Sequence, residues 1–255
     1  MLTRRQEIQG PGIIRPQSGI LKGHEMIRLT RYGIREWLGG GTAALALIGA
    51  GILLTLNDHA VAGWILIIPA GAAWLAIAAF FRVPDRKIPD DPGTLVSPAD
   101  GVVKDIGIVT DHGIEPFGEE PMLRIGIFLS VLDVHVNRMP ADIRVTYRDY
   151  RPGRFLDARN PRCAKENESL IVAGLADIGG LDVPMAVRQV SGAIARRIVC
   201  EVRPGDSAAR GDIYGMIKFG SRTELFFAAD NRITPAVSIG DKVRSGATII
   251  ARMQN

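Results

Sequence analysis

Cysteine is scarce in this 255-residue chain, which contains only Cys163 and Cys200. The two do not form a Cys-x-x-Cys pair, and the chain has no His-Glu-x-x-His run, so the usual zinc and redox spacings are missing. The four histidines are scattered along the sequence at His24, His59, His112 and His135. We therefore expect neither a metal site nor a disulfide framework.

Charge is absent from two long stretches, residues 38–56 and 61–81. Each has about 20 residues, enough for a helix to cross a hydrocarbon core of roughly 30 Å. Only the short polar segment 57–60 separates them, which predicts a tight helical hairpin in a membrane. Glycine and alanine recur in the first run, and small residues allow close helix contact in lipid. A buried helical pair in a soluble core is the alternative.

Lysine and arginine are missing from the segment between the two runs but flank the pair on both sides. The flanking basic residues are Arg28, Arg31, Arg35, Arg82, Arg86 and Lys87. By the positive-inside rule, both ends of the hairpin and everything after residue 81 lie in the cytoplasm, on the inner face of the cell membrane. The same cations would contact anionic headgroups, so the net charge of +4 requires no nucleic-acid partner, and no nucleic-acid motif is visible.

Composition divides the chain into four parts. Residues 1–36 are basic and interrupted by glycine and proline, and the stretch 25–37 is compatible with an interfacial helix. Residues 37–82 form the predicted membrane hairpin. Residues 83–93 are a linker rich in proline and aspartate, and residues 94–255 form a β domain.

From residue 94 onward the sequence has the pattern of β structure. Short apolar, β-branched segments alternate with clusters of Gly, Pro, Asp and Asn, which favours an all-β sandwich or barrel over alternating βα units. The expected strands are 101–109, 123–130, 143–149, 169–173, 185–190, 198–201, 214–219, 223–227 and 248–253. Residues 194–199 fit either a helix or a strand. The predicted fold class is therefore mainly β, preceded by an α-helical transmembrane hairpin.

Two segments, 98–103 and 239–250, resemble turns of barrel-sandwich, lipoyl-like domains. In such domains a Gly-Asp-x-Val-x-x-Gly segment makes a tight turn between strands, and here it runs from Gly240 to Gly246. A lipoyl or biotinyl carrier also needs a modifiable lysine in a setting such as Met-Lys-Met or Asp-Lys-Ala, which this sequence lacks. Carrier function is therefore not expected.

The bond between Gly220 and Ser221 is the most informative place in the β domain. A serine hydroxyl here can attack the preceding carbonyl carbon, because glycine leaves the approach unhindered and tolerates strained backbone. The resulting ester would undergo β-elimination to dehydroalanine, and loss of ammonia would leave a pyruvoyl group at residue 221. The hydroxyl needs a base, for which His135 is the candidate, oriented by Asp100.

Three segments, in order along the chain, carry a resemblance to a known family. They are Ser-Pro-Ala-Asp-Gly at 97–101, Phe-Leu-Ser-Val-Leu-Asp-Val-His-Val-Asn-Arg-Met-Pro at 128–140, and Gly-Met-Ile-Lys-Phe-Gly-Ser-Arg at 215–222. Together they resemble the phosphatidylserine decarboxylase proenzymes, and most closely their short bacterial, membrane-anchored branch. The similarity runs from about residue 32 to the end of the chain.

The resemblance implies that Asp100, His135 and Ser221 are catalytic. It implies self-cleavage into a β-subunit, 1–220, and an α-subunit, 221–255, which stay together as a heterodimer. The covalent pyruvoyl group would be the cofactor, without a metal or pyridoxal phosphate, and would form a Schiff base with phosphatidylserine in the membrane. Loss of CO₂, protonation by His135 and hydrolysis would release phosphatidylethanolamine, a step of phospholipid biosynthesis. The chemistry of the lipid tails and the presence of a homo-oligomer are left open by the sequence.

The cleavage motif departs from the family pattern at one position. Leu-Gly-Ser-Thr is typical of the family, whereas this chain has Phe219, Gly220, Ser221 and Arg222. The scissile pair is intact, and the arginine beside it could contact a carboxylate or phosphate of the substrate. Two further candidates for binding the headgroup are Asn137 and Arg138.

Two other classes of function remain open from the residues alone. Asp100, His135 and Ser221 follow a chain order known from catalytic triads, which fits a membrane-bound serine hydrolase, although the sequence contains no Gly-x-Ser-x-Gly. A non-catalytic barrel-sandwich adaptor on a membrane anchor is the second alternative. Both alternatives predict an uncut chain.

Overall fold

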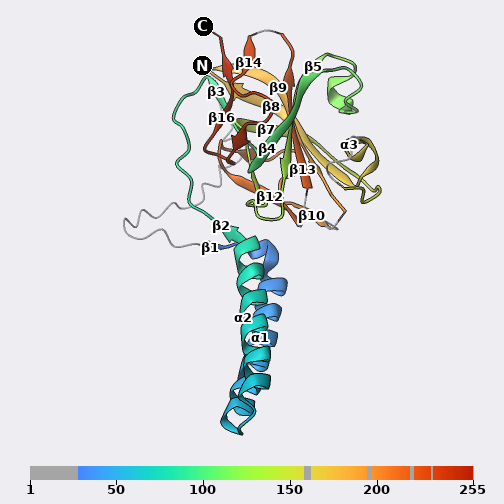
Figure 1. The fold of residues 1–255 in the computed structure, drawn as a ribbon. Helices are drawn as coiled ribbons and strands as arrows, with labels where there is room; N and C mark the ends of the chain where they lie inside the picture. The colour runs from blue at the N-terminus through green and yellow to red at the C-terminus, as the bar shows by residue number, and fades with distance from the viewer. Residues whose placement is uncertain (1–27, 158–161, 194–196, 219–220, 231, 255) are drawn as a thin grey trace, which may run out of the picture.

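The computed structural model describes residues 28–157, 162–193, 197–218, 221–230 and 232–254. Two long helices project together from a domain built of antiparallel strands (Figure 1). The predicted fold class, mainly β with an N-terminal helical pair, is therefore confirmed. Gly220, which precedes the predicted scissile bond, and most of the basic N-terminal segment, residues 1–27, lie outside the described residues.

The two helices, α1 (Ile34–Leu56) and α2 (Ala60–Phe80), lie side by side along their length. Glycine allows their close contact, because a Cβ added to Gly63 would lie 2.5 Å from the carbonyl oxygen of Gly51. Only 11% of the most apolar window of each helix is buried, which argues against a helical pair inside a soluble core. Both helices are long and apolar enough to cross a membrane.

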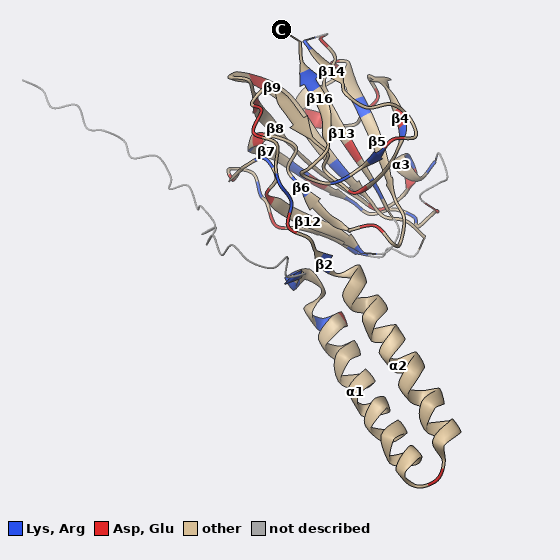
Figure 2. Ribbon diagram, turned by 60° about the vertical axis from the view of Figure 1, so that its left-hand side comes forward, with Lys and Arg blue, Asp and Glu red and all other residues tan. Residues whose placement is uncertain are grey.

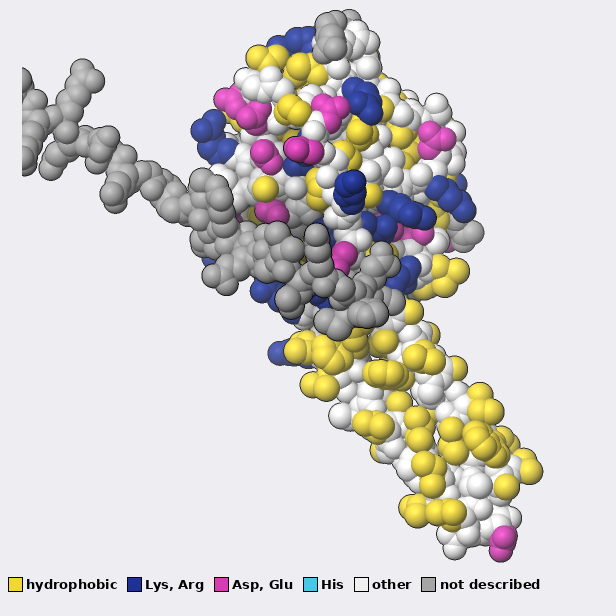
Figure 3. Space-filling model, turned by 90° about the vertical axis from the view of Figure 1, so that its left-hand side faces the viewer, with side chains coloured by type: hydrophobic (Ala, Val, Ile, Leu, Met, Phe, Trp, Pro, Cys, Tyr) yellow, Lys and Arg dark blue, Asp and Glu magenta, His cyan; other side chains and the backbone are white. Residues whose placement is uncertain are grey.

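Charged and apolar side chains divide between the two parts of the molecule. Lys, Arg, Asp and Glu lie on the β domain and near the ends of the helices, and the length of the hairpin carries none (Figure 2). Hydrophobic side chains cover the visible face of the hairpin (Figure 3). Residues such as Leu45, Leu53, Ile65 and Leu75 are exposed there, so the hydrocarbon of a bilayer is the solvent that suits them.

The chain enters the hairpin through a short non-helical junction. β1 (Arg28–Leu29) pairs antiparallel with β2 (Arg82–Val83), and the 3-10 turn η1 (Arg31–Gly33) leads into α1. Of the interfacial helix expected at 25–37, residues 34–37 begin α1 and residues 31–33 form a 3-10 turn, but residues 28–29 form a strand instead. The cause is Thr30, whose backbone N–H donates to the carbonyl of the residue that follows α2, which ties the entering chain to the leaving one.

The β domain contains three sheets. The strands of the largest are β4 (Gly101–Val109), β5 (Met122–Leu129), β7 (Asp142–Arg151), β8 (Ser169–Ile178), β9 (Leu181–Val190), β11 (Ser207–Ala208), β13 (Ser221–Ala228) and β15 (Lys242–Val243). They are ordered β11-β7-β8-β9-β13-β5-β4-β15. The other strands are β3 (Thr94–Val96), β6 (Val136–Arg138), β10 (Arg197–Cys200), β12 (Ile213–Lys218), β14 (Ile233–Pro235) and β16 (Ile249–Met253). They form two sheets, β10-β12-β6 and β14-β16-β3.

One hydrophobic core lies between the large sheet and the two small ones. Ile127 and Leu225 reach it from the large sheet, and Leu95 and Tyr214 from the small sheets. Phe226 belongs to a second cluster, which also takes buried residues from β5, β8 and β9 and from the chain around the short helix η2 (Glu115–Phe117). Because successive strand residues point to opposite faces, β13 is covered by apolar side chains on both sides.

Most strand positions agree with the sequence prediction. β4 has the expected bounds of 101–109, and β5 and β16 differ from theirs by one residue. The segment left open at 194–199 contains β10, a strand, although residues 194–196 lie outside the described residues. The two-residue strand β11 was not among the expected strands. A four-residue helix, α3 (Cys163–Glu166), was not expected.

Truncation of a core residue of β13 should destabilise the β domain strongly. Leu225 is fully buried, so Leu225→Ala should lower the free energy of unfolding by about 2–5 kcal/mol through lost burial and a residual cavity. Ile108→Ala, on the 65%-exposed side chain of β4, is the matched control and should cost less than about 1 kcal/mol. Chemical denaturation followed by far-ultraviolet circular dichroism, which does not rely on tryptophan, measures the free energy of unfolding of both variants. Equal effects would contradict the described core.

Candidate active site

Ser221 is the first residue of β13, and its side chain is fully buried. The strand is paired on both sides almost from its start, with Ser221 opposite Leu129 of β5 and Arg222 opposite Val190 of β9. Among the described residues, the Ser221 hydroxyl oxygen has no hydrogen-bond partner. A buried polar atom without a partner is energetically unfavourable, and such atoms in native proteins call for an explanation such as catalysis.

His135 lies in the segment that joins β5 to β6, and it is also fully buried. β5, before this segment, pairs with β13, which follows the predicted scissile bond. β6, after this segment, pairs with β12, which precedes that bond, and the His135 carbonyl accepts a hydrogen bond from Ile217 of β12 at 3.2 Å. The sheet pairing therefore brings the two sides of the predicted cleavage site to the two sides of His135.

The surroundings of the His135 ring favour its neutral form. Its Nδ1 lies 2.9 Å from the carbonyl oxygen of Asp133, so Nδ1 carries the proton and donates it to that oxygen. The ring also packs on Phe80, the last residue of α2, with 4.3 Å between ring centroids. Burial lowers the pKa of His135 to about 4, because the charged imidazolium is poorly solvated there. At neutral pH the imidazole is therefore a proton acceptor.

The structure does not show the expected contact between Asp100 and His135. The Asp100 carboxylate accepts hydrogen bonds from Arg86 at 2.7 Å through Oδ2, and from the amide and hydroxyl of Ser245 at 2.8 and 2.9 Å through Oδ1. His135 is oriented instead by the backbone carbonyl of Asp133. The sequence could not reveal this, because the linker arginine and the serine are both distant from Asp100 along the chain.

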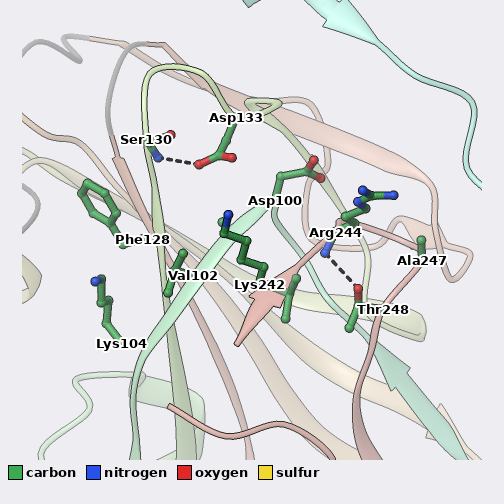
Figure 4. Close-up of a pocket in the computed structure, with 12 residues that line it drawn as sticks. Asp100, Val102, Lys104, Phe128, Ser130, Asp133, Lys242, Arg244, Ala247 and Thr248 are labelled. Carbon is green, nitrogen blue, oxygen red and sulfur yellow. Dashed lines mark hydrogen bonds between the residues drawn. The ribbon is translucent and has the colours of Figure 1, made fainter. Parts of the chain in front are cut away.

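Asp100 lines an open pocket of about 820 Å³ that also reaches the His135 segment. Ser130 and Asp133 of that segment form part of the same wall (Figure 4). The backbone at this point requires glycine after Asp100, because Gly101 has φ of +149° and an added Cβ would lie 2.1 Å from the carbonyl oxygen of Phe128. The Asp-Gly pair of the motif thus fixes the carboxylate at the pocket.

Asn137 and Arg138, expected as candidates for headgroup binding, are engaged inside the protein. The Asn137 amide donates to the Thr223 hydroxyl at 3.1 Å and accepts from Gln189 at 2.8 Å, which links β6 to β13 and β9. Arg138 donates to the backbone carbonyl of Gly211 at 2.8 Å. Burial lowers the pKa of Arg138, with a further contribution from the neighbouring Arg86 guanidinium. Both residues support the site rather than face the pocket.

Arg222, expected beside the cofactor as a possible substrate contact, is also buried. Its guanidinium forms ion pairs with Asp105 at 2.7 Å and Glu224 at 2.9 Å, and Glu224 in turn pairs with Arg188 of β9 at 3.1 Å. Burial alone would lower the pKa of Arg222, but the two carboxylates outweigh it and raise the pKa. Arg222 therefore ties the start of β13 to its neighbours and has little capacity left for a substrate.

The sequence analysis did not single out Lys218, which precedes the predicted cleavage site by two residues. Its side chain is buried, lies 5.7 Å from the ring centroid of Phe81 and pairs with Glu36 of α1. A lysine inside the apolar strand 213–218 was the available signal, because a buried cation requires a partner. The helical hairpin thus holds the strand that leads to the predicted cleavage site.

Comparison with known proteins identifies the family. Residues 75–251 match the sequence model described as phosphatidylserine decarboxylase. The chain belongs to the phosphatidylserine decarboxylase family. This matched range includes Asp100, His135 and Ser221, and the resemblance expected from the sequence motifs is confirmed.

Individual relatives in the phosphatidylserine decarboxylase family cover most of the chain. The phosphatidylserine decarboxylase proenzyme of Rhodopirellula baltica is 43% identical over 206 residues, which are 79% of this chain and 83% of the relative. The proenzyme of Paramagnetospirillum magneticum is 34% identical over 232 residues, or 91% of this chain and 92% of the relative. The latter similarity includes much of the helical hairpin as well as the β domain.

The buried neutral state of His135 predicts a specific pH dependence of stability. The ring takes up a proton below about pH 6.5 in the unfolded chain but only near pH 4 in the folded one, so the unfolded state binds more protons between these values. Stability should therefore fall by up to about 3 kcal/mol as the pH drops from 6.5 to 4. His135→Gln should lack this component when urea unfolding is measured across that range. Parallel curves for the two proteins would contradict the described burial.

Proposed function

We propose that this chain is a self-processing, pyruvoyl-dependent decarboxylase that converts phosphatidylserine to phosphatidylethanolamine and CO₂. Membership of the phosphatidylserine decarboxylase family supports the reaction. The observation that carries self-processing is the buried Ser221 hydroxyl, which has no hydrogen-bond partner among the described residues and begins a strand next to the His135 segment. This proposal needs no metal or pyridoxal phosphate.

In the proposed self-processing reaction, Ser221 is the nucleophile and His135 is the base. The Ser221 hydroxyl attacks the carbonyl carbon of Gly220, and His135 accepts the hydroxyl proton, which suits an imidazole that is neutral at pH 7. The new ester replaces the peptide bond and frees the amine of residue 221. Loss of the Cα proton then breaks the C–O bond, releases the Gly220 carboxylate and leaves dehydroalanine. Tautomerisation, addition of water and loss of ammonia give the pyruvoyl group.

The surroundings of residue 221 fit a pyruvoyl group. The position is enclosed by protein, and β5 and β9 hold the strand behind it, so a carbonyl there would be shielded from water yet fixed in direction. When present, the group supplies an electron sink for the pair left behind as CO₂ departs. A donor role for His135 in that later step requires its pKa to rise, which the negative charge of a bound lipid would favour.

Asp100 is proposed to act at the pocket rather than on His135. Its carboxylate lines the pocket, and the hydrogen bonds from Arg86 and Ser245 fix its direction. A carboxylate held in this way can orient the amine of a serine headgroup that enters the pocket. This assignment keeps Asp100 in the catalytic set that the family resemblance implies, in a different geometry from a triad.

The two products of cleavage, residues 1–220 and 221–255, are proposed to stay together as a heterodimer. β13 lies between β9 and β5, β15 pairs with β4, and β16 pairs with β3, so these three strands after the cut are each hydrogen-bonded to a strand before it. The remaining strand after the cut, β14, pairs with β16. A fragment of this length cannot bury a core alone. Homo-oligomerisation is not required by this arrangement.

The β domain is proposed to lie on the cytoplasmic face of the cell membrane. The two apolar helices support an anchor, and the basic residues on both flanks support the orientation through the positive-inside rule. Arg82, at the end of α2, belongs to the junction between hairpin and β domain. An anchored site reaches its lipid substrate by diffusion in the plane of the membrane.

The alternative functions fit less well. A serine hydrolase of the triad type needs a carboxylate on the histidine, and here Asp100 is paired with Arg86 and Ser245 instead. A non-catalytic adaptor gives no account of a buried serine hydroxyl and a buried neutral histidine on adjoining segments. Family membership favours the decarboxylase over both.

Ser221→Ala should abolish cleavage and decarboxylation together, because no hydroxyl remains to attack Gly220. Intact-mass spectrometry of the purified protein should give two fragments for the wild type, split between residues 220 and 221. The smaller fragment should gain mass on treatment with an amine and cyanoborohydride, which report its terminal carbonyl. The variant should give one full-length mass.

Ser207→Ala is the matched control, since Ser207 is an exposed serine on the edge strand β11. It should process and decarboxylate like the wild type. An uncut wild-type chain, or a Ser221→Ala protein that still releases CO₂ from phosphatidylserine, would refute the proposal.

Phe80→Ala should slow self-cleavage, because it removes the ring on which His135 packs. A misplaced catalytic group can lower a rate by about 10- to 100-fold, and we expect a loss in that range. Leu75→Ala, on a 62%-exposed residue of the same helix, is the control and should process normally. The measurement is the fraction of cut chain against time after cell-free synthesis into lipid vesicles. Equal rates for the two variants would show that α2 only tethers the domain.

A further inference from the structure

Three cations around the pocket have no carboxylate partner. Lys104, Lys242 and Arg244 line the pocket beside Asp100, and all three are exposed (Figure 4). Elsewhere in the described part of the chain, many arginines and lysines form ion pairs, but none of these three does. Unpaired cations gathered at one concave site create a local potential that attracts anions.

The backbone arrangement places all three cations along the same pocket. Lys242 of β15 lies opposite Val102 of β4, and the β4–β5 register shifts between Val103 and Asp105, which marks an irregularity at Lys104. Such bulges redirect a side chain relative to a regular strand. The Lys104 ammonium lies 5.8 Å from the ring centroid of Phe128, which also lines the pocket.

The two carboxylates of the pocket are already engaged. Asp100 is paired with Arg86 and bonded to Ser245, and Asp133 accepts a hydrogen bond from the backbone N–H of Ser130 at 2.7 Å. Their charges are therefore partly compensated within the protein. The net charge of the side chains that line the pocket is positive, so the pocket favours an anionic ligand over a cationic one.

The pocket lies beside the membrane anchor. Ser130 and Asp133 form part of its wall, and Leu132, one of the two residues between them, offers its carbonyl to the Arg82 guanidinium at 2.7 Å. Arg82 also donates to the carbonyl of Ala79 in the last turn of α2, at 2.6 Å. The Leu132 side chain is 84% exposed, as expected for a residue that can enter the lipid interface.

We propose that this pocket binds the phosphodiester of the lipid headgroup through Lys104, Lys242 and Arg244. This proposal deepens the proposed function and rests on it. The two unesterified phosphate oxygens accept charge-assisted hydrogen bonds from the cations, while the acyl end of the lipid stays toward Leu132 and the anchor. The serine end of the headgroup is then directed to Asp100 and the segment that carries His135.

The test compares Lys104→Ala/Lys242→Ala with the wild type, as full-length protein in detergent micelles. Self-cleavage, read by mass, should be unchanged, because no described contact joins either lysine to Ser221 or His135; it also reports correct folding. The KM for phosphatidylserine, as mole fraction in the micelle, should rise at least tenfold, with kcat changed much less. Lys165→Ala is the matched control, since Lys165 pairs with Asp111 away from the pocket and should keep the wild-type KM.

Inorganic phosphate separates a headgroup site from a site for the free ion. It should inhibit the wild type competitively against phosphatidylserine, and the double variant should lose that inhibition. Phosphate that binds the wild type without competing would indicate a free-phosphate site and overturn the proposal. Should the double variant fail to cleave, Arg244→Gln and Lys242→Gln provide milder single changes for the same measurements.

An unchanged KM in variants that cleave normally would refute the headgroup site and leave the proposed function intact. A wild-type protein that cleaves itself but releases no CO₂ from phosphatidylserine would refute the proposed function instead. The two failures are therefore distinguishable in one set of assays.

Discussion

The start of β13 must stay in place although the proposed cut falls immediately before it. Pairing on both sides, to β5 and to β9, begins at the first two residues of the strand. Ion pairs from Arg222 to Asp105 and Glu224 add side-chain contacts at the same point. A free strand end would otherwise fray. Pairing on both sides would therefore be needed to hold a carbonyl at the new N-terminus in a fixed orientation.

The helical hairpin contacts the candidate site, in addition to its proposed role as a membrane anchor. Phe80 packs on the His135 ring, and Glu36 pairs with Lys218 in the strand that leads to the proposed cut. The pocket is connected to the same junction through Arg82 and the Leu132 carbonyl. The helical hairpin, His135 and the proposed headgroup pocket are thus connected through one junction of the β domain, which would place the proposed chemistry next to the lipid.

The sequence predicted the hairpin and most long strands because their signals are local: an uncharged run of sufficient length, or a β-branched segment between turns. Very short strands such as β6 and β15 lack enough residues to show a period. The partners of Asp100, Arg138 and Arg222 were also missed. Each has at least one partner that is distant along the chain, and no local pattern reports which of several arginines will be buried beside a carboxylate.

The interleaving of strands from before and after residue 220 has a consequence for the life of the protein. An uncut chain reaches this sheet order by a unimolecular reaction, with every strand tethered to its neighbours. Once the chain is cut, an unfolded molecule consists of two fragments. Refolding then requires the two fragments to meet, so its rate falls as the protein is diluted. After cleavage the protein could therefore no longer refold in a unimolecular reaction. The mature protein would then persist only because it unfolds slowly.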